Sequence, residues 1–164
     1  MAIYYFDASA VVKYFHREPG TAWVRRIVDL SVGDTERANL VYLANTSRVE
    51  VPAAFAILAR TQRISLRMRD SLYDWFLQNA ESEFESLPLT PTIIRRAGEL
   101  TPKHPLKAYD AVQLAVALDF NATLKQQDLS LIFVSGDEQL LQAAQAEGLE
   151  TDNPFNHTDL DAPE

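Results

Sequence analysis

Four carboxylates spread across most of the chain each lie beside a short apolar segment. Asp7 follows AIYYF, Glu50 lies within SRVEVPAAFAIL, Asp110 within KAYDAVQLAVAL and Asp137 within IFVSGDEQLL. Burying an unpaired carboxylate costs several kcal/mol or raises its pKa, so four that converge require compensating positive charge. The chain has no cysteine, and its three histidines are scattered. An all-carboxylate set favours a hard cation, Mg²⁺ or Mn²⁺, over zinc, and proteins use such ions to hydrolyse phosphodiesters.

The segments that carry these acids alternate between strand-like and helix-like patterns. Short apolar runs predict strands at residues 2–6, 39–43, 84–89, 131–134 and 149–151. Capped or amphipathic segments predict helices at residues 9–16, 21–30, 46–62, 65–83, 90–100, 106–120 and 137–147. This alternation predicts an α/β fold with a parallel sheet and helices on both faces. Asp7 and Asp137 then follow strands, while Glu50 and Asp110 lie in the first turns of helices. All four should meet at the carboxyl edge of the sheet, where such folds bind ligands.

Each acid also has a purely structural interpretation. Asp7 could cap the first helix, and Asp137 could be a first-turn acid that the helix dipole favours. Two Ser-x-x-Glu patterns could be capping boxes, Ser47–Glu50 and Ser135–Glu138. Asp110 is the hardest to explain in this way, because it lies on an otherwise uncharged, apolar helical segment.

Length and composition indicate one ordered domain. The 164 residues are 47% hydrophobic, which supports a sizeable core. We predict a domain over residues 1–154 and an acidic, flexible tail over residues 155–164. No signal peptide is evident, and no apolar run reaches the ~18 residues that a membrane span needs, so we expect no membrane association. The lack of cysteine fits a cytoplasmic protein.

The net charge of −8 is at first sight unfavourable for a nucleic-acid partner. However, residues 150–164 contain five acids and no Lys or Arg. The remainder holds 15 basic and 18 acidic residues, and four of those acids are the candidate site. The acidity is therefore concentrated in the site and the tail, and it does not exclude RNA.

In chain order, the four acidic segments resemble the motifs of the PIN domain family, and specifically of the VapC-type toxin ribonucleases of toxin–antitoxin pairs. The resemblance extends from about residue 3 to residue 154. The matching segments are YFDASAVVKYFHREPG with Asp7, Ser9 and Lys13; SRVEVPAAFAILAR with Arg48 and Glu50; HPLKAYDAVQLAVAL with Asp110; and FVSGDEQLLQAAQAEGL with Ser135 and Asp137. Gln113 departs from the pattern, because many relatives have histidine there.

The resemblance implies a three-layer α/β/α sandwich around a parallel sheet of about five strands. It implies that Asp7, Asp110 and Asp137 bind one or two Mg²⁺ or Mn²⁺ ions, and that Glu50 completes the shell or orients the attacking water. RNA would be cleaved to 5′-phosphate and 3′-hydroxyl ends. The expected partners are the RNA substrate, a cognate antitoxin and a second copy of the chain in a homodimer.

Several other residues could support this chemistry. Ser9 could hold Asp7 through a hydrogen bond, Ser135 keeps the hydroxyl that the motif requires, and Lys13 and Arg48 could face the scissile phosphate. For each of the two cations, a solvated surface charge is the more frequent outcome. Two further sets are candidates for contacts outside the metal site: Arg60, Arg63, Arg67 and Arg69 for RNA backbone, and Tyr14, Phe15 and Trp23, where exposed, for a partner helix.

Two other function classes remain open. One is a PIN-like scaffold that binds nucleic acid or protein without cleaving; the intact acidic set disfavours it. The other is a phosphatase of the haloacid dehalogenase type, whose nucleophilic aspartate also follows the first strand. That chemistry needs a second aspartate two residues later, where this chain has Ser9. It would also trap an aspartyl-phosphate, which mass spectrometry detects.

Overall fold

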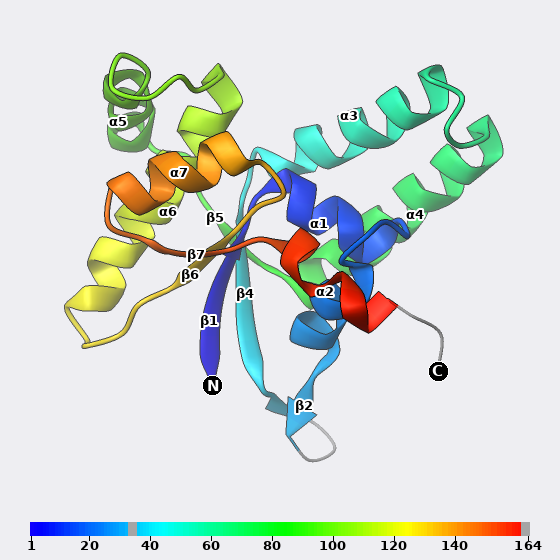
Figure 1. Ribbon diagram of the computed structural model, residues 1–164, viewed down its shortest axis with the longest axis horizontal. Coiled ribbons are helices and arrows are strands. Elements are labelled where there is room, and N and C mark those ends of the chain that lie inside the picture. The colour runs from blue at the N-terminus through cyan, green and yellow to red at the C-terminus, as the bar shows by residue number, and fades with distance from the viewer. Residues whose placement is uncertain (33–35, 162–164) are drawn as a thin grey trace.

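The computed structural model describes residues 1–32 and 36–161, and its centre is a five-stranded sheet (Figure 1). The strand order is β5-β4-β1-β6-β7, and every pairing is parallel. The strands are β1 (Ala2–Phe6), β4 (Asn39–Ala44), β5 (Glu85–Leu87), β6 (Ile132–Val134) and β7 (Glu150–Asp152). All five predicted strands are therefore confirmed. A two-stranded antiparallel ribbon, β2 (Ser31–Val32) with β3 (Glu36–Arg37), was not predicted.

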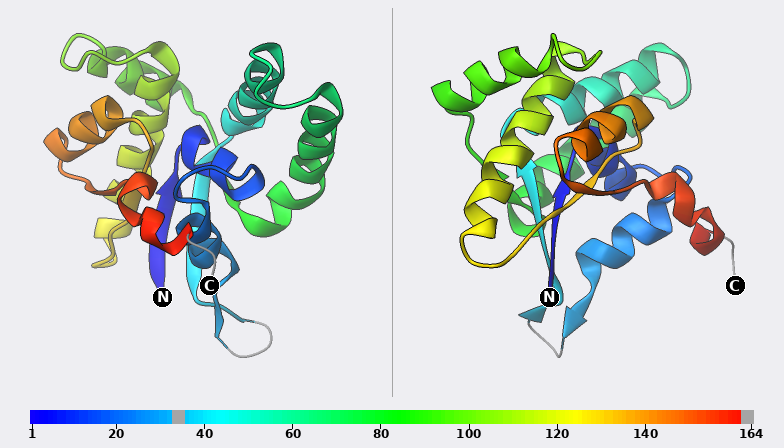
Figure 2. Two further views of the ribbon diagram at one scale, coloured as in Figure 1. Left: turned by 45° about the vertical axis from the view of Figure 1, so that its right-hand side comes forward. Right: turned by 60° about the vertical axis from the view of Figure 1, so that its left-hand side comes forward.

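Helices cover both faces of the sheet, as expected for parallel strands joined by helical crossovers. One face is covered by α5 (Pro91–Leu100), α6 (Ala108–Lys125) and α7 (Glu138–Ala146). The other is covered by α1 (Ala8–Phe15), α2 (Thr21–Asp29), α3 (Ser47–Arg60) and α4 (Leu66–Glu83). Figure 2 shows the sheet between these two groups, with α3 and α4 projecting from one side as a helical hairpin. The three-layer sandwich is thus confirmed.

The central strand β1 contributes to two separate cores. Tyr5 points toward α6 and stacks on Phe133 with ring centroids 5.4 Å apart, while Phe6 points toward the α1 side. Both aromatic side chains are completely buried. A strand that is buried on both faces reads as a continuous apolar run, which is why AIYYF shows no alternation.

The register of the sheet places two site residues side by side. Phe6 pairs with Val134 at the carboxyl end of the sheet, so the next residues, Asp7 and Ser135, come at the same level. The backbone N–H of Asp7 donates to the carbonyl of Val134 at 3.1 Å, which ties the two strand ends together. The sheet itself therefore fixes the starting point of the site.

The C-terminal segment differs from the flexible tail predicted for residues 155–164. Residues Pro154–Asp161 form 3₁₀ turns, η1, that pack against α2. The carboxylate of Asp161 accepts hydrogen bonds from the backbone N–H groups of Gly20 and Ala22, where α2 begins. The imidazole of His157 stacks on the indole of Trp23 at 4.2 Å. As far as Asp161, this segment is part of the domain; residues 162–164 lie outside the described residues.

The contact between η1 and α2 predicts a difference between two glycines. Gly20 has φ +88°, and a Cβ there would lie 2.4 Å from the carbonyl oxygen of Pro154. Gly148 has φ +87°, but a Cβ there would meet nothing within 4 Å. Gly148→Ala should cost about 1–3 kcal/mol of unfolding free energy from backbone strain alone, and Gly20→Ala should cost clearly more because η1 must also shift. Urea denaturation of both variants measures this, and equal losses would contradict the packing of η1 on α2.

The aromatic residues that we considered for a partner helix are mostly internal. Tyr14 and Phe15 are 8% and 2% exposed and pack among Trp75, Phe76 and Phe84. They belong to the core on the α1 side, so the condition under which they would serve a partner helix, that they are exposed, is not met for either residue. Within the described residues, no helix is long and apolar enough to cross a membrane.

Candidate active site at the carboxyl edge of the sheet

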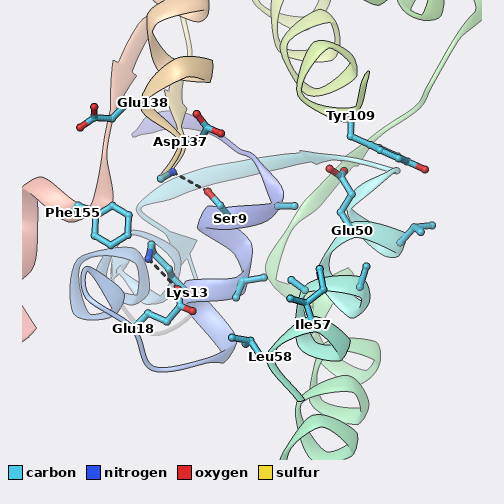
Figure 3. A pocket seen from close by; sticks show the side chains of 16 residues that line it. Ser9, Lys13, Glu18, Glu50, Ile57, Leu58, Tyr109, Asp137, Glu138 and Phe155 are labelled. Atoms are coloured by element: carbon cyan, nitrogen blue, oxygen red, sulfur yellow. Dashed lines mark hydrogen bonds and ion pairs between the residues drawn. The ribbon is translucent and has the colours of Figure 1, made fainter. Parts of the chain in front are cut away.

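An open cleft of about 950 Å³ lies between α1, α3 and the start of α7. Glu50 and Asp137 line it from opposite sides, and Tyr109 lies next to Glu50 (Figure 3). Much of the remaining wall is apolar and comes from α1 and α3, including Val12, Ala54 and Ile57. The cleft therefore combines carboxylates with surfaces that suit the faces of nucleobases.

Asp7 is 6% exposed and is not among the residues that line this cleft, although the next two residues, Ala8 and Ser9, are. Its Oδ1 accepts hydrogen bonds from the Ser9 hydroxyl at 2.7 Å and from the Ala10 N–H at 2.9 Å, while its Oδ2 accepts from the Ser135 hydroxyl at 2.6 Å. Asp7 is thus the N-cap of α1, and with three hydrogen bonds to its carboxylate it is the most extensively hydrogen-bonded of the four acids. Burial raises its pKa, the hydrogen bonds from Ser135, Ala10 and Ser9 lower it, and nearby Asp110 raises it further.

The two serines also connect Asp7 to the loop that carries Asp137. The hydroxyl of Ser9 accepts a hydrogen bond from the N–H of Gly136 at 2.8 Å, and the hydroxyl of Ser135 accepts one from the N–H of Asp137 at 3.0 Å. Each serine therefore donates to Asp7 and accepts from this loop. The predicted role of Ser9 in holding Asp7 agrees with these contacts, and Ser135 is used in the same way instead of in a capping box with Glu138.

Asp137 is the N-cap of α7. Its Oδ1 accepts from the N–H groups of Gln139 and Leu140 at 2.8 and 3.1 Å. Among the described residues, no hydrogen bond to its Oδ2 is present, and the side chain lines the cleft. The structural and functional interpretations of Asp137 are therefore compatible, because one oxygen caps the helix and the other is available to the cleft.

Glu50 is held by a glutamine rather than by the predicted capping box. The Nε2 of Gln113 donates to Glu50 Oε2 at 2.6 Å and to the Ser47 hydroxyl at 3.2 Å. The N-cap of α3 is Thr46, which makes no side-chain capping bond. Burial raises the pKa of Glu50, the hydrogen bond from Gln113 lowers it, and Asp7 and Asp110 raise it further.

Asp110, in the first turn of α6, links the four acids electrostatically. Its carboxylate raises the pKa of Asp7 and of Glu50, while the pKa of Asp110 itself is raised by burial and then by Asp137, and lowered by Lys107. The fold thus brings all four predicted acids within electrostatic reach at one edge of the sheet. The four side chains do not converge on a single point, however. Within residues 1–32 and 36–161, no three His, Cys, Asp or Glu side chains are close enough together to hold one ion.

The donor set nevertheless fits a hard divalent cation. None of the four carboxylates takes part in an ion pair in the described part of the chain, and three of the four have raised pKa values. The hydroxyl oxygen of Thr46, next to Glu50, is buried without a hydrogen-bond partner among these residues. Mg²⁺ commonly uses one or two carboxylates together with waters and substrate phosphates, so a site without three converging protein ligands remains suitable for it.

The two cations predicted to face the scissile phosphate are engaged elsewhere. The side chain of Lys13 is 3% exposed; its Nζ pairs with Glu18 at 3.1 Å and lies 4.0 Å from the ring centroid of Phe155. Arg48 is half exposed and pairs with Glu81 of α4 at 2.8 Å. Lys13 is therefore buried in the wall of the cleft, and the ion pair of Arg48 connects α3 with α4.

The arginines at positions 60, 63 and 67 are exposed around the turn between α3 and α4, and Arg69 pairs with Asp70.

The raised pKa of Asp7 predicts a specific pH dependence of stability. Because the folded-state pKa is above the ordinary value of 3.8, the folded chain binds this proton more tightly than the unfolded chain does. Asp7 therefore opposes folding increasingly as the pH rises from about 3.8 through the raised pKa, and the penalty is complete above it. The stability of Asp7→Asn relative to wild type should rise between about pH 4 and pH 7 in metal-free buffer.

Asp161 provides the matched control of opposite sign. Burial raises its pKa, but the hydrogen bonds from the backbone of Ala22 and Gly20, together with the charges of Arg17 and Lys13, outweigh burial and hold the pKa below the ordinary value. Its stabilising contribution is present above the ordinary pKa and is lost as the pH falls through the lowered one. Asp161→Asn should therefore lose stability relative to wild type as the pH rises. Chemical denaturation at several pH values measures both trends; parallel curves for wild type and Asp7→Asn would mean that Asp7 is not desolvated.

Sequence reasoning missed Gln113 and Tyr5 as site residues. Gln113 lies three residues after Asp110 on the same helix and is the polar residue of an otherwise apolar stretch, so its spacing placed it on the face of Asp110. That signal was available, but Gln113 was treated only as a departure from a family pattern. Nothing in the sequence indicates that Tyr5 contacts it.

Comparison with known proteins decides the family. Residues 4–146 match the family model of the PIN domain. The chain belongs to the PIN domain family. Two relatives from Mycobacterium tuberculosis, named Ribonuclease VapC45 and Ribonuclease VapC49, are each 30% identical to it over 149 residues, which is 90% of this chain and 93% of each relative.

Solved structures share the fold of this chain. FitAcB from Neisseria gonorrhoeae contains a chain with a TM-score of 0.60 at 19% identity, covering 93% of this chain and 98% of that one. VapBC2 from Rickettsia felis, bound to a DNA fragment from its promoter, contains one with a TM-score of 0.58 at 13% identity, covering 92% and 98%. At these identities the likeness establishes the fold.

Proposed function

We propose that this PIN domain is an endoribonuclease that hydrolyses RNA phosphodiester bonds at the cleft, with Mg²⁺ or Mn²⁺ as cofactor. The observation that carries the proposal is the arrangement of Asp7, Glu50, Asp110 and Asp137. At the carboxyl edge of the sheet, Asp7, Glu50 and Asp110 lie within electrostatic reach of one another, and Asp137 lies within reach of Asp110; no described cation forms an ion pair with these four. The names of the M. tuberculosis relatives support ribonuclease as the activity.

In this proposal Asp7, Asp110 and Asp137 would bind one or two metal ions, directly or through water. When bound, such an ion would lower the pKa of a water and neutralise charge that develops on the scissile phosphate. Ser9 and Ser135 orient the buried carboxylate of Asp7, and Asp137 presents its uncapped oxygen to the cleft. Glu50, held by Gln113, would orient the attacking water, and cleavage would leave a 5′-phosphate and a 3′-hydroxyl.

The biological role in this proposal is that of a toxin acting on cytoplasmic RNA and inhibited by a cognate antitoxin. Carboxylates in and beside the cleft attract any cation, so an arginine from a partner could occupy the site in place of a metal and block RNA entry at the same time. The apolar cleft wall formed by α1 and α3 could receive the rest of such a segment. A homodimer is part of the same proposal, and light scattering of the purified chain tests it.

The experiment that tests the activity uses the purified chain and a mixed pool of tRNA, ribosomal RNA and mRNA. We expect cleavage at a limited number of positions, with ends that accept ligation as 5′-phosphates. RNA that binds and remains uncut, with Mg²⁺ and Mn²⁺ each supplied, would favour the inert scaffold. A trapped aspartyl-phosphate on Asp7 would instead indicate a phosphatase.

A further inference from the structure

A chain of buried hydrogen bonds runs from the centre of the sheet to the cleft. The hydroxyl of Tyr5 donates to Gln113 Oε1 at 2.6 Å, and Gln113 Nε2 donates to Glu50 Oε2 at 2.6 Å and to the hydroxyl of Ser47. Tyr5 and Ser47 are completely buried, and Gln113 is 1% exposed. Three segments that are far apart in the sequence, β1, α3 and α6, are therefore joined at one amide group.

The direction of these bonds fixes which way the amide of Gln113 points. Tyr5 lies in the core on the α6 side, where its hydroxyl has Gln113 Oε1 as its hydrogen-bond acceptor. The phenol therefore remains a donor, and the amide oxygen must face it. The amide nitrogen is consequently turned toward the cleft, where it can only donate. A donor at this position requires Glu50 to present an oxygen as acceptor.

The free-energy cost of disturbing the hydrogen bonds of the Gln113 amide is high because these bonds are buried. A flipped amide would place its NH₂ group against the Tyr5 hydroxyl and its oxygen against the Glu50 carboxylate, which leaves buried groups unsatisfied. Ser47 adds a second acceptor for the same NH₂ group. Glu50 is therefore held by a group that cannot rotate, although it lies in the first turn of α3 at the mouth of an open cleft.

We infer that Gln113 is a positioning residue for the reaction, which fixes the Glu50 carboxylate at the cleft through an orientation set by Tyr5. The inference rests on the proposed function, in which Glu50 orients the attacking water. It gives a role to position 113, where this chain has glutamine and many relatives have histidine. Tyr5, buried in the sheet, takes part by fixing the orientation of the Gln113 amide. Neither residue touches the substrate.

The kinetic test uses Gln113→Met, which keeps the length of the side chain and removes the amide. We expect kcat for RNA cleavage to fall roughly 10- to 100-fold with KM nearly unchanged, as is typical when a hydrogen bond that orients a site residue is lost. Tyr5→Phe keeps the packing and releases the amide, so a smaller fall is expected. Gln113→His, which retains a donor and an acceptor, should recover part of the loss.

A double-mutant cycle separates positioning from stability. In the Glu50→Gln background, Gln113→Met should cause little further loss, because both residues act through the same contact. The matched control is Asn121→Leu on the same helix. Asn121 is 5% exposed, and its amide oxygen accepts from the N–H of Leu131, away from the cleft. Asn121→Leu should lower stability and leave kcat unchanged.

A measurement that does not depend on catalysis is NMR of the Gln113 side-chain NH₂ group in the intact chain. We expect slowly exchanging protons whose shifts change on Glu50→Gln and on Tyr5→Phe. Full kcat in folded Gln113→Met, equal losses from that substitution with and without Glu50, or NH₂ signals insensitive to both substitutions would each overturn the inference. A wild-type chain that does not cleave RNA would instead overturn the proposed function. The NMR result would still show whether the hydrogen bonds from Tyr5 to Gln113 and from Gln113 to Glu50 are formed.

Discussion

Asp7→Asn and Asp110→Asn should each reduce RNA cleavage by on the order of 10²-fold or more, while the fold remains intact. Each substitution removes one negative charge from the proposed metal site, where several kcal/mol of transition-state stabilisation is expected, and each 1.4 kcal/mol corresponds to a factor of ten. The isosteric amide at position 7 can still accept the N–H of Ala10 at the start of α1. Initial rates on a labelled RNA, with circular dichroism as a check of folding, measure the effect.

The chain offers a matched control for Asp110→Asn. Asp119 lies on the same helix, α6, but is exposed, and it is not among the groups that shift the pKa of Asp7, Glu50 or Asp110. Asp119→Asn therefore changes the net charge by the same amount without affecting the site, and it should cleave at the wild-type rate. If Asp7→Asn and Asp110→Asn also retained wild-type rates, the four acids would be helix caps and solvated first-turn residues with no part in catalysis.

Expression of the wild-type chain should arrest bacterial growth, and expression of Asp7→Asn should not. This difference follows from the proposed toxin activity, because cleavage of essential RNA acts catalytically, whereas the variant reaches the same concentration without cleaving. Viable counts after induction, with protein levels matched by immunoblot, provide the measurement. Equal toxicity of the two proteins would indicate a cause other than cleavage.

Co-expression of a cognate antitoxin with a basic C-terminal segment should restore growth. Replacing the arginine that enters the cleft should weaken this rescue more than replacing a basic residue distant from it, because only the former pairs with the desolvated carboxylates. A wild-type chain that is harmless in several hosts and recovers no partner by pull-down would favour a solitary nuclease or an inert scaffold.

Sequence patterns were sufficient for the layers of this fold because each pattern corresponds to one physical requirement. A strand buried on both faces must be continuously apolar, as β1 is, and Thr90-Pro91 at the start of α5 supplies a cap and a proline at the first helical position. The position of the four acids at one edge of the sheet also followed from topology, because parallel strands place their carboxyl ends at one edge. The resemblance to PIN domains then supplied the chemistry.

The parts that sequence could not supply depend on contacts between distant side chains. Glu50 and Ser47 match a capping box, but both bind Gln113, which is more than 60 residues away in the chain. Lys13 was expected to face a phosphate, yet its charge is neutralised by Glu18 and covered by Phe155. The acidity of residues 155–161 suggested a flexible tail, although the carboxylate of Asp161 caps α2 from outside. A local pattern does not reveal a competing tertiary partner.

The most direct test of the metal-dependent site is cleavage of RNA by EDTA-treated chain into which Mn²⁺ is titrated. The account predicts no cleavage in EDTA and a saturable recovery with Mn²⁺. It also predicts a rise in melting temperature over the same concentration range, because the ion binds only the folded site. Asp7→Asn should show neither effect, whereas Asp119→Asn should show both. Undiminished cleavage in EDTA, or recovery that is identical in Asp7→Asn, would contradict the account.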